Sequence, residues 1–297
     1  MTTAAWTDCR RRRSIVAGQQ STPSGAGGLE FDPLSTGTTV VTATIPGFIT
    51  TAAGARTVTV GTPAINIAAN LGSIGSGLQF GAFGGSLAAS QHGGVTVHLA
   101  SSDPSRVLLA PNATTPGLAA IDIPVPNGQT GFSFFVQGTD WIPGTSSAQP
   151  VAIAITAPGF IGDSTSINYV QAALDLQSVP TTIGATAANV DFTVRIGVPA
   201  AFNTSITTQQ PRRAGAAPLI VTVSSGDTVV AEIDFNGGVN GDQPLTATIA
   251  VGQSATPFNT AGGLEFDPKA MGTTVVTATI PGFITTAAGT KTVTINP

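Results

Sequence analysis

The two histidines of the chain, His92 and His98, invite a first test for chemistry because their spacing is even. In an extended strand, even spacing puts both side chains on one face, where they could share a metal ion. Leu99 and the valines before it fill the alternate positions, so we expect His98 to point to solvent and Gly93-Gly94 to turn His92 away. A third ligand at a matching spacing does not follow. The sequence therefore predicts no metal site.

A Ser-His-Asp arrangement is the second chemistry that the residue types allow. Asp103 lies near His98 in the sequence, and serines are frequent around both. A serine hydrolase of the common type places its nucleophile in a Gly-x-Ser-x-Gly turn between a strand and a helix, and the sequence has no such segment in that context. We predict no catalytic residue and no enzyme, and an esterase-like hydrolase on this scaffold remains the last alternative.

Carboxylates recur at turn-like positions. Glu30 and Asp32 lie in a Leu-Glu-Phe-Asp-Pro segment that returns with Glu265 and Asp267, and we interpret both segments as turns. Further carboxylates in expected turns are Asp140, Asp163, Asp227, Asp234 and Asp242. Paired carboxylates can bind calcium, but turn carboxylates more often accept hydrogen bonds from their own backbone. The sequence therefore predicts no cofactor, with calcium as the open alternative.

Aromatic residues that could recognise a sugar are few. Trp6, Trp141 and Tyr169 are the only tryptophans and tyrosine of the chain. Trp141 follows Asp140 in an expected loop, so it is either an exposed contact or, as is usual for a single Trp in a β-sandwich, packed against a sheet. The ligand-binding residues are unknown from sequence.

Composition narrows the class of protein. Charged residues make up only 9% of the 297 residues, whereas about a quarter is usual in globular proteins. The net charge is −4. The one basic cluster, Arg10–Arg13, is too small and too isolated for a nucleic-acid surface. Cys9 is the single cysteine, so a disulfide within one chain is excluded. Gly, Pro, Thr and Ser with 41% hydrophobic residues favour an all-β protein of many short strands.

Neither a membrane span nor an export signal is expected in the chain as given. No apolar run reaches the roughly 18 residues that a spanning helix needs. The apolar stretch behind Arg10–Arg13 is also too short for a signal peptide. Low charge and high Thr, Ser and Gly content nevertheless suit an extracellular or cell-surface protein.

The elements that would position these residues are repeats. Residues 37–54 and 272–289 read GTTVVTATIPGFITTAAG without one difference, and a diverged copy, VAIAITAPGF, occupies residues 151–160. In each copy apolar and polar residues alternate, which predicts a half-buried antiparallel strand. The Pro-Gly that follows predicts a type II turn with glycine at its third position. A closing strand is expected after each turn.

Anchoring on these copies divides the chain into four parts. We predict a non-repeat tail at 1–17, the C-terminal half of a unit at 18–61, and complete units at 62–171 and 172–297. Within the complete units, residues 95–109 and 220–231 are expected to form strand–turn–strand hairpins. Residues 120–125 and 246–251 are expected to be strands that end in Gly-Gln turns. An insertion near 199–218, with Arg212 and Arg213, sets the last unit apart.

The segments VTVHLASSDPSRVLLAP, PVPNGQTGFSFFVQG and VAIAITAPGF, together with the LEFDP…GTTVVTAT stretches, resemble the tandem immunoglobulin-like repeats of large bacterial surface and secreted proteins. The resemblance covers nearly all of the chain from Gly18 onward. It implies tandem immunoglobulin-like β-sandwiches, the first of them incomplete. The truncated first unit and the 199–218 insertion depart from the family pattern.

The function implied by this resemblance is non-enzymatic: a structural, spacer or adhesin-type repeat segment. The alternative is a module that binds a cell-surface glycan, a protein or another copy of itself. Self-association would proceed through strand addition at the incomplete unit, whose edge strand is unpaired.

Overall fold

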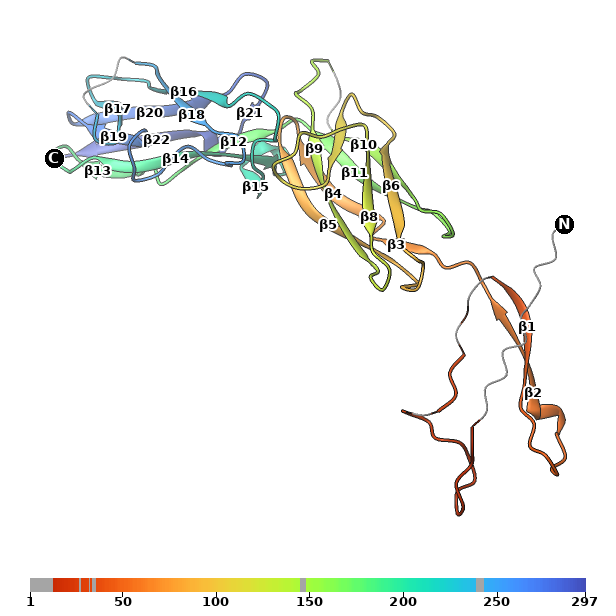
Figure 1. Ribbon diagram of the computed structural model, residues 1–297. Helices are drawn as coiled ribbons and strands as arrows, with labels where there is room; N and C mark the ends of the chain where they lie inside the picture. The colour runs from red at the N-terminus through yellow and green to blue at the C-terminus, as the bar shows by residue number, and fades with distance from the viewer. Residues whose placement is uncertain (1–12, 27, 32, 34–35, 145–147, 239–242) are drawn as a thin grey trace. The chain divides into compact units, whose positions relative to one another are not determined.

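The computed structural model describes residues 13–26, 28–31, 33, 36–144, 148–238 and 243–297. The described chain is built almost entirely from β-strands (Figure 1), which confirms the predicted all-β class with tandem immunoglobulin-like sandwiches and an incomplete first one. It forms two compact units, Met1–Thr62 and Pro63–Pro297. Trp6, Cys9, Arg10–Arg12, Asp32 and Asp242 lie outside the described residues. The described part contains no helix long and apolar enough to cross a membrane.

The unit from Pro63 begins with a sandwich of two sheets. One sheet has the strand order β3-β5-β9-β7 and the other has the order β4-β11-β10-β6-β8. β4 runs parallel to β11, whereas the other pairs are antiparallel. The strands are β3 (Ile65–Ile67), β4 (Asn70–Gly75), β5 (Gln79–Leu87), β6 (Val95–Ser101), β7 (Val107–Ala110), β8 (Ala120–Val125), β9 (Gly131–Gly138), β10 (Gln149–Thr156) and β11 (Asp163–Val170).

A second sandwich repeats this order. Its sheet β13-β22-β20-β16-β18 corresponds strand for strand to β4-β11-β10-β6-β8, and the series β12-β14-β19-β17 corresponds to the other sheet, to which β15 and β21 are added. The strands are β12 (Ala173–Gln177), β13 (Thr182–Gly184), β14 (Val190–Pro199), β15 (Ile206–Gln209), β16 (Leu219–Ser225), β17 (Ala231–Phe235), β18 (Leu245–Ile249), β19 (Leu264–Pro268), β20 (Gly272–Thr279), β21 (Ile284–Thr285) and β22 (Thr290–Asn296), with short 3-10 helices η2 (Ala201–Asn203) and η3 (Ala287–Gly289).

The alternating pattern of the repeats produces strands with one buried face. Ile153 and Ile155 on β10, and Val276 and Ala278 on β20, are buried as predicted. Of the residues that alternate with them, Ala154, Thr156 and Thr279 are exposed and Thr277 is half-buried. Burying every second side chain removes apolar surface from water while the polar residues stay solvated. The predicted faces of both strands are therefore confirmed.

The Pro-Gly-Phe turns have the predicted geometry in all three copies. Gly47, Gly159 and Gly282 have φ of 83°, 80° and 82°, the value that the third position of a type II turn requires. The backbone N–H of the following Phe donates to the carbonyl three residues earlier, at 3.0–3.2 Å. The Gly-Gln turns at Gly18, Gly128 and Gly252 share this geometry, with φ of 86°, 88° and 80°.

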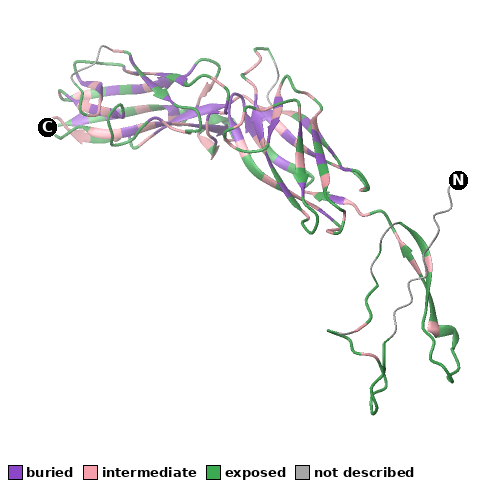
Figure 2. Ribbon diagram, viewed as in Figure 1, coloured by how far each residue is buried: buried purple, intermediate pink, exposed green. Residues whose placement is uncertain are grey.

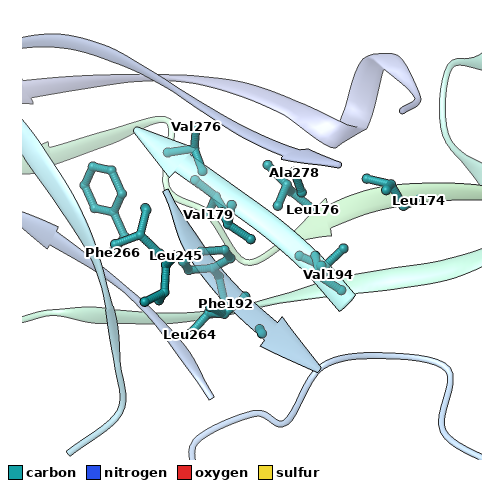
Figure 3. Close-up of a cluster of buried hydrophobic side chains, with 14 of the residues drawn as sticks. Leu174, Leu176, Val179, Phe192, Val194, Leu245, Leu264, Phe266, Val276 and Ala278 are labelled. Carbon is teal, nitrogen blue, oxygen red and sulfur yellow. The ribbon is translucent and has the colours of Figure 1, made fainter. Parts of the chain in front are cut away.

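Each sandwich has a hydrophobic core between its sheets, visible as the buried strand faces in Figure 2. Leu99, Phe134 and Ile153 belong to the core of the first sandwich. In the second, Phe192 from β14, Phe266 from β19 and Val276 from β20 converge (Figure 3). Burying such side chains contributes roughly 1.5–3 kcal/mol each, so both sandwiches have their own source of stability.

The predicted hairpins at 95–109 and 220–231 are wrong. β6 and β7 belong to opposite sheets, and so do β16 and β17. The loops that begin with Ser101-Ser102 and Ser224-Ser225 therefore cross from one sheet to the other and do not reverse the chain within a sheet. Both strands of each pair alternate, which is compatible with either arrangement, so the pattern alone did not distinguish them.

The Leu-Glu-Phe-Asp-Pro segment of the last unit is strand β19 and not a turn. It pairs with β14 on one edge and with β17 on the other. Leu264 and Phe266 point into the core, which leaves Glu265 and Asp267 on the opposite face. Asp234 was also expected in a turn, but it is a buried residue of β17.

In the first unit, the described residues form a two-stranded antiparallel hairpin of β1 (Gly37–Thr42) and β2 (Ala55–Val60), with the 3-10 helix η1 (Ala52–Gly54) before β2. Ile45, Phe48 and Ile49 near its turn are exposed. The segment Gly28–Phe31 is not a strand here. The hairpin has no second sheet among the described residues of its unit.

Candidate functional site

The junction between the two sandwiches is the most elaborately built polar site in the described chain. β11 ends at Val170 and β12 begins at Ala173, so only two residues connect the sandwiches. Leu78 follows the turn after β4, and its backbone belongs to the first sandwich: its carbonyl accepts from Gly138 N at 2.9 Å. Its side chain, however, is fully buried in the core of the second sandwich. A leucine held by the first sandwich thus inserts its side chain into the core of the second.

Gln210 binds the first sandwich through both ends of its buried amide. Its Oε1 accepts from Gly75 N at 2.9 Å, and its Nε2 donates to Ser73 O at 2.8 Å. Gln209, just before it, ends β15, which pairs with β14 of the second sandwich. The side chain therefore completes the β4 edge of one sandwich from a strand of the other. A buried amide with both groups paired avoids the cost of desolvation.

Arg212 lies two residues further along and is also buried. Its Nη1 donates to Gly77 O and to Asp140 Oδ1, both at 3.0 Å, while its Nε donates to Ala217 O at 2.9 Å. Gly77 has a φ of 72°, and a Cβ on it would lie 2.2 Å from Arg212 Nη1. Glycine is therefore required there both by backbone conformation and by the close approach of the guanidinium.

Two further glutamines extend the network beneath the junction. Gln79 Oε1 accepts from Ala214 N at 3.0 Å and from Gln137 Nε2 at 3.3 Å. The Gln137 amide also bonds to Thr115 O and Gly117 N, at 2.9 Å each. Because every polar end is paired, the network specifies one relative position of the two sandwiches.

A hollow of about 290 Å³ opens on the junction. Its walls include Asp140 and Trp141 from the first sandwich and Pro281–Phe283, the repeated turn, from the second. Trp141 is half-buried: it packs against the core of the first sandwich and stacks on Tyr169 of β11, with ring centroids 5.7 Å apart and planes at 15°. Burial raises the pKa of Tyr169, whose hydroxyl lies 3.0 Å from Asp140 O. The hollow is small and polar-edged, as expected of a seam between domains.

The histidines are not brought together. His98 is exposed on β6, as predicted, and its Nδ1 lies 2.7 Å from Asp122 Oδ1 on the neighbouring β8. His92 precedes the strand, and its Nδ1 accepts from Gly94 N at 3.1 Å. Asp103 bonds to Ser105 and Arg106 and not to His98. The hydrogen bond from Ser105, with help from Arg106, lowers the pKa of Asp103.

Three carboxylates do converge, on the outer face of β17 and β19. Oxygen atoms of Glu232, Asp234 and Asp267 lie within 4.8 Å of one another. Lys269 forms ion pairs with two of them, with its Nζ 3.2 Å from Glu232 Oε2 and in closer contact with Asp267. The hydrogen bond with Asp267, and a second with Glu232, raise the pKa of Lys269. The Lys269 ammonium group thus already pairs with two of these carboxylates. The cluster therefore fits calcium poorly.

Millimolar calcium is therefore expected to leave the Tm of the unmodified chain unchanged. In Lys269→Met, where the carboxylates lose their ammonium partner, calcium should raise Tm by a few degrees and a chelator should reverse the rise. Calorimetry with and without calcium measures both, with Lys291→Met as the control. A calcium-dependent rise in the unmodified chain would show that the ion competes with Lys269.

Several residues of the junction were not identified from sequence. Arg212 was noticed only as part of an insertion, and Gln79, Gln137 and Gln210 were not singled out. In a chain with 11 Lys and Arg residues, an internal arginine is an informative residue, and the Arg212-Arg213 pair was the available signal. Glutamines at strand ends carry no comparable signal.

Comparison with known proteins adds limited information. No protein-family model and no curated protein matches the chain. Similar solved structures include the D00-D0 domain of Intimin, at 10% identity, with 79% of this chain and 100% of that chain covered and a TM-score of 0.31. The Yersinia pseudotuberculosis adhesin InvE matches at 13% identity, with 80% and 58% covered and a TM-score of 0.28. The zebrafish RET cadherin-like domains 1 to 4 match at 9% identity, with 82% and 53% covered and a TM-score of 0.35. These TM-scores are low, so no functional argument rests on them.

Proposed function

We propose that the chain is a structural, spacer or adhesin-type repeat segment of a bacterial surface or secreted protein, in which domains 62–171 and 172–297 are held head to tail in one fixed orientation. The observation that carries the proposal is the junction, where Leu78 enters the neighbouring core and Gln210 and Arg212 bond across the seam. A spacer must transmit position from one end to the other, and a satisfied polar seam restricts rotation between domains.

The connection between the domains supports the same function. Domains joined by Gly- and Ser-rich linkers move independently. Here two residues connect β11 to β12, and the first of them, Gln171, donates from Nε2 to Gly282 O at 3.1 Å. In this proposal the protein is extracellular or on the cell surface, has no catalytic residues and no cofactor, and binds no nucleic acid. A binding partner would be a surface glycan or a protein.

The proposal predicts a narrow distribution of distances between the domains. Thr96 and Thr246 are both exposed. Spin labels on cysteines at these two positions, in a Cys9→Ser background, would report the distance distribution by double electron–electron resonance. Arg212→Gln should broaden the distribution, because Gly77 O and Asp140 lose their partner across the seam. Arg56→Gln, the same charge change at an exposed residue outside the junction, is the matched control. A broad distribution in the unmodified chain would contradict a fixed spacer.

A second candidate function is binding through the first unit. Its hairpin exposes Val41, Ile45 and Phe48, and exposed apolar side chains that lie together mark contact surfaces more often than isolated ones do. Light scattering over a concentration series tests whether the occupant is another copy, and a glycan array tests sugars.

A further inference from the structure

The identical repeats place one sequence in two environments. In the last unit, Val276 and Ile280 are 0% and 4% exposed, whereas their counterparts in the first unit, Val41 and Ile45, are 44% and 47% exposed. Leu264, in the preceding segment, is 0% exposed and its counterpart Leu29 is 56% exposed. Because the residues are the same, the difference lies in what covers them. The last unit therefore shows which strands pack against this sequence when its apolar face is buried.

The covering structure in the last unit is the first half of its own sandwich. β16 pairs with β20, so that Thr222 lies opposite Thr279 and Val223 opposite Ala278. β13 pairs in parallel with β22. β14 and β17 pair with the two edges of β19 and, with β12, form the facing sheet. Every one of these strands comes from residues 172–262.

The hairpin of the first unit shows the effect of lacking this cover. β20 continues to Thr279, but β1 ends at Thr42, two residues before the corresponding position, Thr44. The two missing residues correspond to Ala278 and Thr279, which pair with β16. Likewise Leu29–Phe31 is not a strand, whereas its counterpart, Leu264–Phe266, lies in β19. The described residues of the first unit thus retain the hairpin and lack what a partner strand and a facing sheet would order.

We propose that the first unit is an acceptor for a half-sandwich donated by a separate polypeptide, a segment with the strand pattern of residues 172–262. This deepens the second candidate function by naming the partner. A strand of the pattern of β16 would add to the outer edge of β1 with Thr44 opposite the position of Thr222. A facing sheet of the pattern of β12, β14 and β17 would cover Val41 and Ile45 and order residues 29–31 as a strand.

A second copy of the whole chain is a poor donor. Its β16 is already paired on both edges, with β18 and with β20. Displacing its own hairpin would uncover as much apolar surface as it covers, because the two hairpins have nearly the same sequence, so association would gain no burial. A donor must therefore present the first half of a unit without its own last hairpin.

The test uses the full chain with Cys9→Ser and, as the probe, a tagged polypeptide of residues 172–262 co-expressed with it. We expect capture of the chain by the tag, and a disulfide between Thr44→Cys in the chain and Thr222→Cys in the probe. Ile45→Asp should reduce capture at least tenfold. Thr57→Asp, on β2, should leave it unchanged, because its counterpart Thr292 is exposed and pairs with β20 but not with β13 or β16. Both variants alter exposed residues, so neither should unfold the free chain.

Three results would overturn the proposal. If Ile45→Asp does not reduce capture of the chain, or if no disulfide forms at Thr44→Cys, the probe binds elsewhere. A dimer of the full chain alone that Ile45→Asp dissociates would make a second copy the occupant. A monomeric chain that captures no probe would show that the hairpin accepts no such half. None of these outcomes alters the distance distribution across the junction, which tests the spacer function separately.

A second measurement applies if the probe does not accumulate. A chain whose residues 1–26 are replaced by an additional copy of residues 172–261 carries the donor half directly before the acceptor. Amide exchange at residues 37–60 should then slow to the level seen at residues 272–295, by at least a hundredfold. Unchanged exchange at residues 37–60 would overturn the proposal, because the donor would be present and not accepted.

Discussion

Replacing Leu78 with alanine is expected to lower the free energy of unfolding of the second sandwich by about 2–5 kcal/mol, although Leu78 belongs by its backbone to the first. The side chain is fully buried in the core that contains Phe192, Val221 and Phe266. Removing it leaves a cavity at the end of that core. The adjacent Gly75, on which a Cβ would lie 2.8 Å from Leu78 Cδ1, packs directly against this side chain and has none of its own to fill the space.

Calorimetry or urea denaturation measures the effect, and Leu118→Ala is the control. Leu118 is in the first sandwich too, but 60% exposed, so its truncation should cost within about 0.5 kcal/mol. We expect the transition of the second sandwich, followed by amide exchange at β14 and β20, to shift for Leu78→Ala alone. Equal shifts in the two variants would mean that the Leu78 side chain does not support the core of the second sandwich.

The parts of the fold that could be predicted from sequence are local. Alternation in residues 151–157 and 272–280 identified both the strands and their buried faces, because burial of every second residue is a property of the strand itself. Pro-Gly identified the turns, because only glycine adopts φ near 80° without strain at the third turn position. Neither inference needed knowledge of what lies across the sheet.

The errors arise where local pattern is compatible with two structures. Residues 264–268 contain Asp-Pro, which is a turn signal. Their apolar residues Leu264 and Phe266 give too short an alternation to indicate a strand. β6 and β7 look like a hairpin because the pattern cannot show which sheet each strand joins. In both cases the outcome depends on pairing with distant strands, which the local sequence does not specify.

The junction depends on tertiary structure even more. Gln210 and Gln79 are buried only because another domain covers them, and their bonds join residues 135 positions apart. Polar residues at a strand end are usually solvated, so nothing in the local sequence indicates that these two are buried. The same reasoning explains the two environments of the repeat: sequence predicts a hairpin with one apolar face, and only the neighbouring strands decide whether that face is covered.

Arg195→Met is expected to destabilise the second sandwich by about 3 kcal/mol, because it leaves a buried carboxylate without its cation. Asp175 lies opposite Arg195 on β12 and β14, and its side chain is 1% exposed. Arg195 Nε and Nη2 donate to its two oxygens at 3.1 and 3.0 Å. Asp175 Oδ2 also accepts from Ile206 N at 3.4 Å. That residue begins β15, the strand that leads into Gln210 and Arg212, so the ion pair also supports the junction.

A double variant separates the charge from the packing. Adding Asp175→Leu to Arg195→Met removes the unpaired charge and should recover most of the lost stability, since apolar pairs often replace buried ion pairs without cost. Arg195→Lys keeps a cation but not the two-point contact, and its loss should be intermediate. Urea denaturation of the three variants gives the comparison. If the double variant is as unstable as Arg195→Met, the stability comes from the stem of Arg195 against its neighbours, and the ion pair is not what fixes β15 to the sheet.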